Sequence, residues 1–358
     1  MRYPNFLPEN GTIGFIAPSF GCNIEPYLSA FKNALKTFQE KGYQVKLGPN
    51  CFEGSGIGIS NTPEKCAQEF MEAWQDGDSD ILISCGGGEL MCEILPYVDF
   101  ETIKNTPAKW FEGYSDNTNL AFLLATICDT AAIYGPCAPA FGMKKWHPSL
   151  TDSFSILTGS SACAADPDSD DVIHSSAVST FTVHGYDLYE IESLKDEDHP
   201  LEPYNVTQPV IRKRFPDQDA QFSGRLVGGC LDILCMLCGT KYDRVKAFNE
   251  RYADDGVIWF LEACDLNVLS IRRAIWQLEQ AGWFANAKGF LIGRPLNGEA
   301  LFGLDQYDAV TKVLEKYNVP ILMDLDIGHL PPMMPLIEGS MVDVKITGND
   351  LTIQMFLI

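Results

Sequence analysis

One serine in this sequence has the neighbours that nucleophilic chemistry needs. It lies in the segment GYSDN at residues 113–117, after an extended apolar stretch and before an apolar, helix-like run at residues 120–125. A sharp turn from a strand into a helix exposes a serine hydroxyl and aims the next backbone N–H at the group under attack. The segment is close to the G-x-S-x-G elbow, with Asn117 in place of the second glycine. It predicts Ser115 as a nucleophile, with an ordinary turn as the alternative for so short a motif.

A serine nucleophile needs a base, and His329 is the candidate among the five histidines. It follows an apolar, strand-like segment at residues 320–327, and Gly328 before it lets the backbone come close. The alternative is that His329 is a loop histidine with no catalytic role. Solvated or capping roles are expected for the other four, which fall in or beside a polar stretch: His147, His174, His184 and His199.

The carboxylate that would orient this histidine is predicted at Glu262. This residue ends the apolar run at residues 258–261, where a charge is poorly solvated and needs a partner such as an imidazolium. A glutamate exposed at the rim of a strand end is the alternative. The chain order Ser115, Glu262, His329 is compatible with a catalytic triad.

A glycine-rich turn at residues 86–88 is the candidate for stabilising a developing negative charge. Backbone N–H groups of Gly87 or Gly88, together with that of Asp116, would form an oxyanion hole. No phosphate-binding motif of the G-x-x-x-x-G-K-[ST] or G-x-G-x-x-G type accompanies the turn. Cys85 beside it is an alternative nucleophile if its pKa is lowered, but the strand-to-helix turn belongs to Ser115.

The elements that must position these residues alternate between strands and helices in the first part of the chain. Thr62 is the expected N-cap of one helix, with proline at its first position. Such alternation predicts a parallel sheet covered on both faces, with the site beyond the carboxyl ends of its strands. The strands are expected at 11–19 (ending in a turn), 43–47, 80–84 and 108–111, and the helices at 26–42 and 62–74.

The composition changes from about residue 144 to residue 221. This span is rich in Ser, Asp, Thr and Pro, with an acidic run at residues 166–171. Short alternating segments at 180–183 and 186–191 predict an antiparallel element. Beyond it we expect strands at 256–261 and 289–293, with a helix at 270–281 between them. The predicted division is a nucleophile domain (1–145), a connector (146–221) and a C-terminal domain carrying Glu262 and His329 (222–358).

Composition excludes several classes of protein. The 358 residues suit two domains, and 46% hydrophobic with 21% charged residues is typical of a globular protein. A net charge of −22 argues against a nucleic-acid partner, and no apolar run is long enough to span a membrane. The first residues lack signal-peptide features, and the twelve cysteines are scattered through apolar segments, so we expect reduced thiols in the cytoplasm. Cys235 and Cys238 form an isolated C-x-x-C in an apolar helical pattern, so neither metal nor cofactor is expected.

A series of segments, taken in order, resembles the LD-carboxypeptidase-like serine peptidases, which include muramoyl-tetrapeptide carboxypeptidases and microcin C immunity peptidases. The resemblance implies Ser115 as nucleophile, Glu262 as the acidic member and His329 as base. It also implies a flavodoxin-like N-terminal α/β domain, a smaller β-rich α+β C-terminal domain, a site between them and usually a homodimer. The segments are 13–19, 61–64, 87–88, 95–99, 113–118, 134–136, 224–229, 238–240, 260–262, 293–294 and 328–329.

Two departures bear on the substrate. Glu89-Leu90-Met91 follows the paired glycines, where muramoyl-tetrapeptide carboxypeptidases usually carry an aromatic residue, a glycine and a small residue. The connector is also longer, and both features look more like the microcin-immunity branch. The implied substrate is a small peptide cut beside a free carboxylate, or a microcin C-like aminoacyl-nucleotide amide. A non-catalytic binder of such molecules on the same fold is the alternative.

Two charged residues are candidates for binding substrate. Arg294 ends an apolar strand and would hold a carboxylate, because a chain of net charge −22 has no general attraction for anions. A surface ion pair is its alternative. Glu89 would favour an amine or a basic group near the scissile amide, with helix capping or simple exposure as alternatives.

Overall fold

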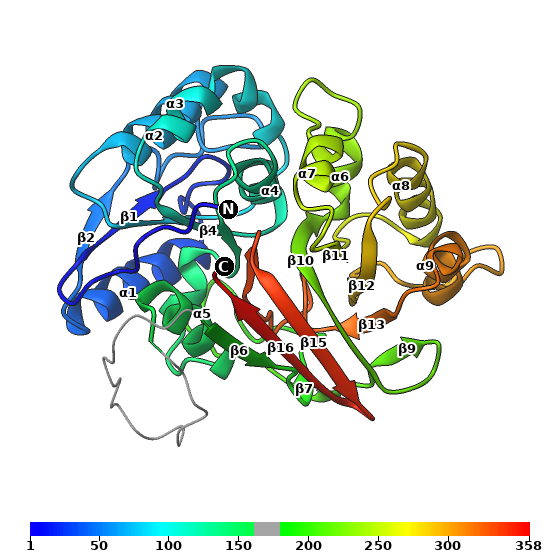
Figure 1. Ribbon diagram of the computed structural model, residues 1–358. Coiled ribbons are helices and arrows are strands. Elements are labelled where there is room, and N and C mark those ends of the chain that lie inside the picture. Colours follow the sequence, from blue (N-terminus) through cyan, green and yellow to red (C-terminus); the bar gives the residue numbers. More distant parts are fainter. Residues whose placement is uncertain (161–179) are drawn as a thin grey trace.

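The structure is a computed structural model that describes residues 1–160 and 180–358. The acidic run at 166–171 and His174 therefore lie outside the described residues. Two sheets organise the chain, one in each lobe of the molecule (Figure 1). No helix within the described ranges has the length and apolar character that crossing a membrane requires.

The first sheet has the strand order β14-β5-β4-β3-β1-β2. Strands β1 to β5 all run parallel, and β14 joins β5 antiparallel. The order 2-1-3-4-5 is that of a flavodoxin-like sheet, which confirms the predicted N-terminal fold. Its strands are β1 (Thr12–Ile16), β2 (Gln44–Leu47), β3 (Ile81–Ser84), β4 (Trp110–Gly113), β5 (Ala132–Tyr134) and β14 (Leu336–Glu338).

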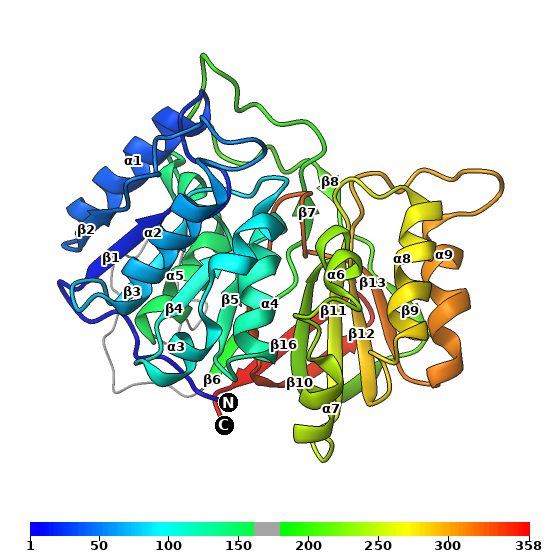
Figure 2. The same ribbon diagram turned by 90° about the horizontal axis from the view of Figure 1, so that it is seen from above.

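Helices cover both faces of this sheet. Helix α4 lies between the two sheets, and every one of its residues is buried (Figure 2). Thr62 occupies the predicted N-cap of α2, but its side chain makes no capping hydrogen bond, whereas Pro63 opens the helix as expected. The α-helices are α1 (Tyr27–Glu40), α2 (Pro63–Gln75), α3 (Phe100–Asn105), α4 (Thr118–Thr126) and α5 (Pro148–Thr158), with 3-10 turns at Met91–Tyr97, Ser115–Asn117 and Ala138–Gly142.

The second sheet has the order β6-β16-β15-β10-β11-β12-β13-β9. Its central strands β10 to β13 are parallel, and the strands on either side are antiparallel to their neighbours. Its strands are β6 (Thr180–His184), β9 (Lys213–Phe215), β10 (Ala220–Cys230), β11 (Val257–Glu262), β12 (Ala287–Gly293), β13 (Ile321–Leu325), β15 (Met341–Thr347) and β16 (Asp350–Phe356). Helices α6 (Leu231–Leu237), α7 (Val245–Arg251), α8 (Val268–Gln280) and α9 (Gln306–Leu314) accompany them, with a 3-10 turn at Glu315–Tyr317.

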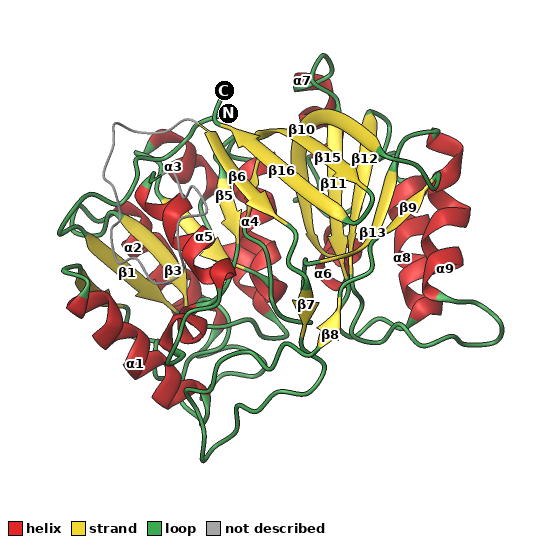
Figure 3. Cartoon of the chain, turned by 90° about the horizontal axis from the view of Figure 1, so that it is seen from below, coloured by secondary structure: helices red, strands yellow, loops and turns green. Residues whose placement is uncertain are grey.

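Several strands pair across the proposed domain division, which stays a prediction. Strand β14 comes from the last quarter of the chain but completes the first sheet, and β6 and β9 of the connector join the second. Figure 3 shows β6 and β16 lying between β5 and the rest of the second sheet. The two remaining connector strands, β7 (Leu188–Tyr189) and β8 (Gln208–Pro209), form a small antiparallel pair.

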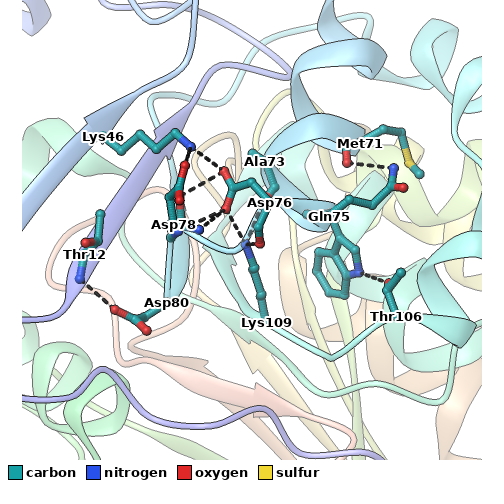
Figure 4. A network of polar contacts seen from close by, with 12 residues as sticks. Thr12, Lys46, Met71, Ala73, Gln75, Asp76, Asp78, Asp80, Thr106 and Lys109 are labelled. Carbon is teal, nitrogen blue, oxygen red and sulfur yellow. Dashed lines mark hydrogen bonds and ion pairs between the residues drawn. The ribbon is translucent and has the colours of Figure 1, made fainter.

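A polar network ties together the edge of the first sheet at which β1, β3 and β4 begin (Figure 4). Asp76 ends α2 and accepts hydrogen bonds from Lys109 at 2.8 Å and from Lys46 at 2.9 Å. Asp80 accepts one from the backbone of Thr12 at 2.7 Å. Burial alone would raise the pKa of Asp76, but the two lysines outweigh it and hold that pKa below its usual value. This network lies at one edge of the sheet. The site is expected at the opposite edge, where the parallel strands have their carboxyl ends.

Candidate active site

Ser115 stands at the turn between β4 and α4, as its sequence predicts. Its backbone has φ of +62°, a left-handed conformation that is strained for a residue other than glycine. Asn117, in the place of the second elbow glycine, donates hydrogen bonds to the carbonyls of Tyr114 at 3.0 Å and Gly86 at 2.8 Å. The asparagine therefore fastens the serine turn to the glycine turn.

The three predicted side chains lie in one hydrogen-bonded row. Ser115 Oγ is 2.9 Å from Nε2 of His329, and Nδ1 of His329 is 2.9 Å from Oε2 of Glu262. Glu262 is fully buried, which rules out the exposed rim glutamate, and 13% of the His329 side chain is exposed. Gly328 has φ of +104°, and a Cβ there would lie 2.5 Å from the Glu262 carboxylate, so only glycine fits before His329.

The electrostatics of the row favour an ionised pair. Burial alone would lower the pKa of His329, but the Glu262 carboxylate outweighs it and holds that pKa above its usual value of 6.5. Burial would likewise raise the pKa of Glu262, yet the His329 charge and the hydrogen bonds to the carboxylate hold it below 4.5. The sequence left open the direction in which the pKa of His329 is shifted. The buried Glu262 carboxylate determines that this pKa is raised.

The glycine turn at residues 86–88 lies directly against Ser115. A Cβ built on Gly87 would be 2.9 Å from Cβ of Ser115 and 3.1 Å from its Oγ. The carbonyl of Gly87 accepts a hydrogen bond from the backbone of Phe20 at 3.0 Å. In the described part of the chain, the backbone N–H groups of Gly87, Gly88 and Asp116 have no hydrogen-bond acceptor. They are free to face a substrate oxygen.

The side chain of Asp116 has a structural role that sequence reasoning missed. Its carboxylate accepts hydrogen bonds from Ser19 Oγ at 2.6 Å, from the backbone of Met91 at 3.0 Å and from Asn119 at 3.0 Å. Burial raises its pKa to about 6. The carboxylate therefore connects three loops at the carboxyl ends of the strands, while its own backbone N–H stays beside Ser115.

A second residue missed from the sequence is Tyr134, the last residue of β5. Its hydroxyl lies 2.6 Å from Oε1 of Glu262 and 3.3 Å from the backbone nitrogen of Ser115. The available signal was its place at the carboxyl end of the strand next to β4, since such positions meet at one edge of a parallel sheet.

The structure disfavours Cys85 as a nucleophile. Its thiol is buried, and burial together with the neighbouring thiols of Cys22 and Cys51 raises its pKa well above the usual value. A thiol that stays protonated is a weak nucleophile. The cysteines within residues 1–160 and 180–358 are all free thiols, and no group of His, Cys, Asp and Glu side chains there is arranged to hold a metal ion.

Arg294 forms an ion pair, but this pair is buried. The interpretation of Arg294 as part of an ion pair at the surface is therefore wrong. Its guanidinium is 2.8 Å from Asp326, donates to the Asp324 carbonyl at 3.0 Å and covers the Tyr189 ring at 4.5 Å. Asp326 also pairs with Arg212 at 2.6 Å. A cation already paired in this way has little charge left for a substrate carboxylate, and its binding role stays a prediction.

Glu89 lies exposed next to the glycine turn. Its backbone N–H donates to the carbonyl of Gly58 at 2.9 Å, and its carboxylate has no hydrogen bond or ion pair within the described ranges. The side chain is therefore accessible beside the serine turn, and substrate recognition by Glu89 stays a prediction.

The two halves of the chain match two domains of one family. Residues 13–135 match the LD-carboxypeptidase N-terminal domain, and residues 223–344 match the LD-carboxypeptidase C-terminal domain. The microcin C7 self-immunity protein MccF of Escherichia coli is 26% identical over 97% of this chain and 94% of its own length.

Solved structures share the fold. An MccF-like protein from Bacillus anthracis superposes with a TM-score of 0.79 at 22% identity, covering 99% of both chains. MccF in complex with aspartyl sulfamoyl adenosine gives 0.77 at 21%, covering 99% of this chain and 100% of that one. Muramoyltetrapeptide carboxypeptidase from Oxalobacter formigenes gives 0.66 at 18%, covering 96% and 98%. The chain belongs to the LD-carboxypeptidase family and is a serine carboxypeptidase or amidase.

Proposed function

We propose that Ser115, His329 and Glu262 are the catalytic triad of an amidase that cuts beside a free carboxylate or cleaves a microcin C-like aminoacyl-nucleotide amide. The observation that carries this proposal is the row of two 2.9 Å hydrogen bonds from Ser115 through His329 to Glu262. Each residue lies at or just after the carboxyl end of a strand, where sites of such sheets lie.

The geometry supports a two-step acyl transfer. Nε2 of neutral His329 takes the proton of Ser115 Oγ as that oxygen attacks the carbonyl carbon. His329 then gives the proton to the nitrogen of the leaving group, the amide bond breaks and an ester to Ser115 remains. A water molecule, deprotonated by the same His329, hydrolyses the ester. Glu262 keeps the imidazole N–H at Nδ1 and stabilises the imidazolium.

The oxyanion hole of the proposal consists of the Asp116 backbone N–H and one or both of those of Gly87 and Gly88. Gly87 contacts Ser115, Asp116 follows it in the chain, and none of the three N–H groups has an acceptor in the described structure. Donors held in this way lower the barrier because they need not reorient as charge develops. The N–H of Ser115 itself is excluded, since it already points to Tyr134.

Gly87→Ala is expected to reduce kcat/KM by about 100-fold, because the new methyl group would displace Ser115 or the turn by a fraction of an ångström. The contact would be 2.9 Å from Cβ of Ser115. Gly77→Ala is the matched control, since a Cβ there meets nothing within 4 Å. Both variants are assayed for turnover and for thermal unfolding. Equal activity of the two would remove Gly87 from the oxyanion hole.

The substrate is proposed to be nearer to that of the immunity branch. The E. coli relative is named a microcin C7 self-immunity protein, and a solved MccF holds aspartyl sulfamoyl adenosine. Glu89, exposed beside the serine turn, supplies a negative charge suited to an amine on the acyl group. We also propose a homodimer, the cytoplasm as location and the three-part domain division given above.

Mass spectrometry of reaction mixtures tests the proposed substrate. Purified protein is incubated with an aminoacyl sulfamoyl adenosine and, separately, with an LD-linked muramoyl tetrapeptide. We expect Ser115-dependent release of the free amino acid from the sulfamoyl compound, faster than from the peptide. Cleavage of the tetrapeptide alone would contradict the preferred substrate. Failure on both, under conditions where an LD-carboxypeptidase is active, would contradict the amidase proposal.

A further inference from the structure

We propose that Tyr134 is a positioning residue of the triad. Its single hydroxyl fixes the positions of the Glu262 carboxylate and the Ser115 backbone relative to each other. The inference rests on the proposed roles of Ser115, His329 and Glu262. It extends them to a residue of β5 that touches neither the substrate nor the imidazole. The argument depends on where the hydroxyl lies, on its protonation state and on what holds the ring.

The hydroxyl of Tyr134 stands at the centre of the site. It is 2.6 Å from Oε1 of Glu262, while Oε2 of the same carboxylate is 2.9 Å from Nδ1 of His329. Each oxygen of Glu262 thus has its own partner, and the plane of the carboxylate is determined. On its other side, the hydroxyl lies 3.3 Å from the nitrogen of Ser115.

The direction of these hydrogen bonds follows from protonation. Burial and the adjacent Glu262 carboxylate raise the pKa of Tyr134 well above its usual value of 10, so the phenol is neutral at the pH of an activity assay. A neutral phenol has one proton, and the Glu262 carboxylate can only accept it. The lone pairs of the same oxygen are then left for the N–H of Ser115. Tyr134 therefore donates to one triad member and accepts from another.

This contact also joins the two sheets. Tyr134 ends β5 of the first sheet and Glu262 ends β11 of the second, and the Ser115 to His329 contact crosses the same boundary. Because two hydrogen bonds cross this boundary, they fix the relative orientation of the two sheets at the site, whereas a single hydrogen bond would allow rotation about it. A hydrogen bond to a buried charge is also among the stronger ones in proteins.

The ring of Tyr134 is held independently of its hydroxyl. It packs against Phe260 with centroids 5.1 Å apart and against Tyr114 at 6.4 Å. Because these contacts involve only carbon atoms, phenylalanine keeps them. Tyr134→Phe thus removes one oxygen from the site and little else.

Loss of the hydroxyl changes how strongly the pair holds its proton. With Oε1 unpartnered, the charge of Glu262 is less compensated and stabilises the His329 imidazolium more strongly. The other titratable groups facing the pair are the thiols of Cys230 from β10 and Cys264 after β11, and the phenol of Tyr114, whose ring is 5.1 Å from that of His329. None of them is altered by the substitution. Neutral His329 therefore forms at higher pH in the variant without the hydroxyl, and the rising limb of its pH–rate profile moves to higher pH.

Tyr134→Phe is tested against Tyr252→Phe. Tyr252 also donates its hydroxyl to a carboxylate, Asp129 at 2.5 Å, but away from the triad. We expect Tyr134→Phe to lower kcat/KM by about 10- to 100-fold and to shift its rising limb upward by about one pH unit, the size of one lost hydrogen bond to a charged group. Tyr252→Phe should leave both unchanged. An unshifted limb in folded Tyr134→Phe overturns the proposal, because a merely structural role predicts no shift.

Tyr134→3-fluorotyrosine gives the opposite sign and covers the case in which the phenylalanine variant does not fold. Its more acidic phenol donates more strongly to Glu262, so the rising limb should move to lower pH, and an unshifted limb here overturns the proposal as well. Ser115→Ala is measured in parallel. An active Ser115→Ala would overturn the proposed triad, whereas an inactive one with unshifted Tyr134 variants would overturn only the role of Tyr134.

Discussion

Ser115→Ala is expected to abolish turnover and leave the fold intact. The substitution removes the oxygen that lies 2.9 Å from Nε2 of His329 and would become the ester oxygen of the acyl-enzyme. Loss of a serine nucleophile from a triad costs about 10⁴-fold or more in kcat, because the remaining oxyanion hole cannot replace covalent catalysis. Alanine keeps the same left-handed backbone and fills no new space, so the free energy of unfolding should change by only about 1 kcal/mol.

The measurement compares kcat/KM and thermal unfolding of Ser115→Ala with those of Ser79→Ala. Ser79 is also a hydrogen-bonded serine, with its hydroxyl 3.3 Å from Asp76, but it belongs to the network at the opposite edge of the sheet. Ser79→Ala should keep full activity. Near-normal turnover by Ser115→Ala on a verified substrate would show that another group is the nucleophile.

Glu262→Gln should have the second largest effect, a loss of about 10³- to 10⁴-fold in kcat/KM. The amide has nearly the same shape as the carboxylate but no charge, and its NH₂ group can drive the proton of His329 to Nε2, the nitrogen that must accept from Ser115. In the wild type the pKa of His329 is raised, and neutral His329 is the proposed base, so we expect activity to rise with pH through a value above 6.5. In Glu262→Gln that limb should move to lower pH, although the maximum is far lower.

The same pair makes stability depend on pH, and the sign follows from its two shifts. The raised pKa of His329 stabilises the fold below pH 6.5, and this contribution is lost as pH rises through the folded-state value. The lowered pKa of Glu262 stabilises it above pH 4.5, and this contribution is lost as pH falls through its folded-state value. Glu262→Gln should therefore unfold at a lower temperature than the wild type at about pH 6, with a smaller difference in strong acid.

Glu338→Gln is the control for removing a buried carboxyl group. Burial raises the pKa of Glu338 on β14 well above 4.5, so the folded state prefers the neutral form. Its amide variant should be as stable as the wild type or more stable at neutral pH, with the pH–rate limb unchanged. If the rising limb of the pH–rate profile of Glu262→Gln also stays where it is in the wild type, the assignment of His329 as the base is contradicted.

Local patterns in the sequence were enough to predict the triad candidates and strands β1 to β4 of the first sheet, but not β5 or β14. Ser115, Glu262 and His329 each follow an apolar run, and in a parallel sheet the carboxyl ends of such strands meet at one edge. The periodicity of residues 26–42 and 62–74 depends only on neighbours along the chain, so α1 and α2 were found within two residues of their ends.

Contacts between distant segments could not be predicted in this way. The hydroxyl of Tyr134 meets Glu262 across 128 positions of sequence, and nothing near either residue reveals the other. Arg294 was a candidate for holding a substrate carboxylate, with a surface ion pair as the alternative, and nothing in the sequence indicated that Asp326 forms a buried pair with it. Helix α5 was missed because its polar positions, Ser and Thr, resemble those of the surrounding connector.

The late origin of β14 has a consequence for how the enzyme is made. Strand β5 leaves the ribosome long before Leu336 does, by about 10–40 s at the usual rates of synthesis of about 5–20 residues per second. During that interval β5 has an open edge, and open strand edges are templates for pairing with other chains. The same wait applies to His329, which is also translated late. A chain that ends before Leu336 therefore has an incomplete first sheet, and before residue 329 it also lacks the proposed base, so on the proposed triad it becomes hydrolytic only after His329 has been translated.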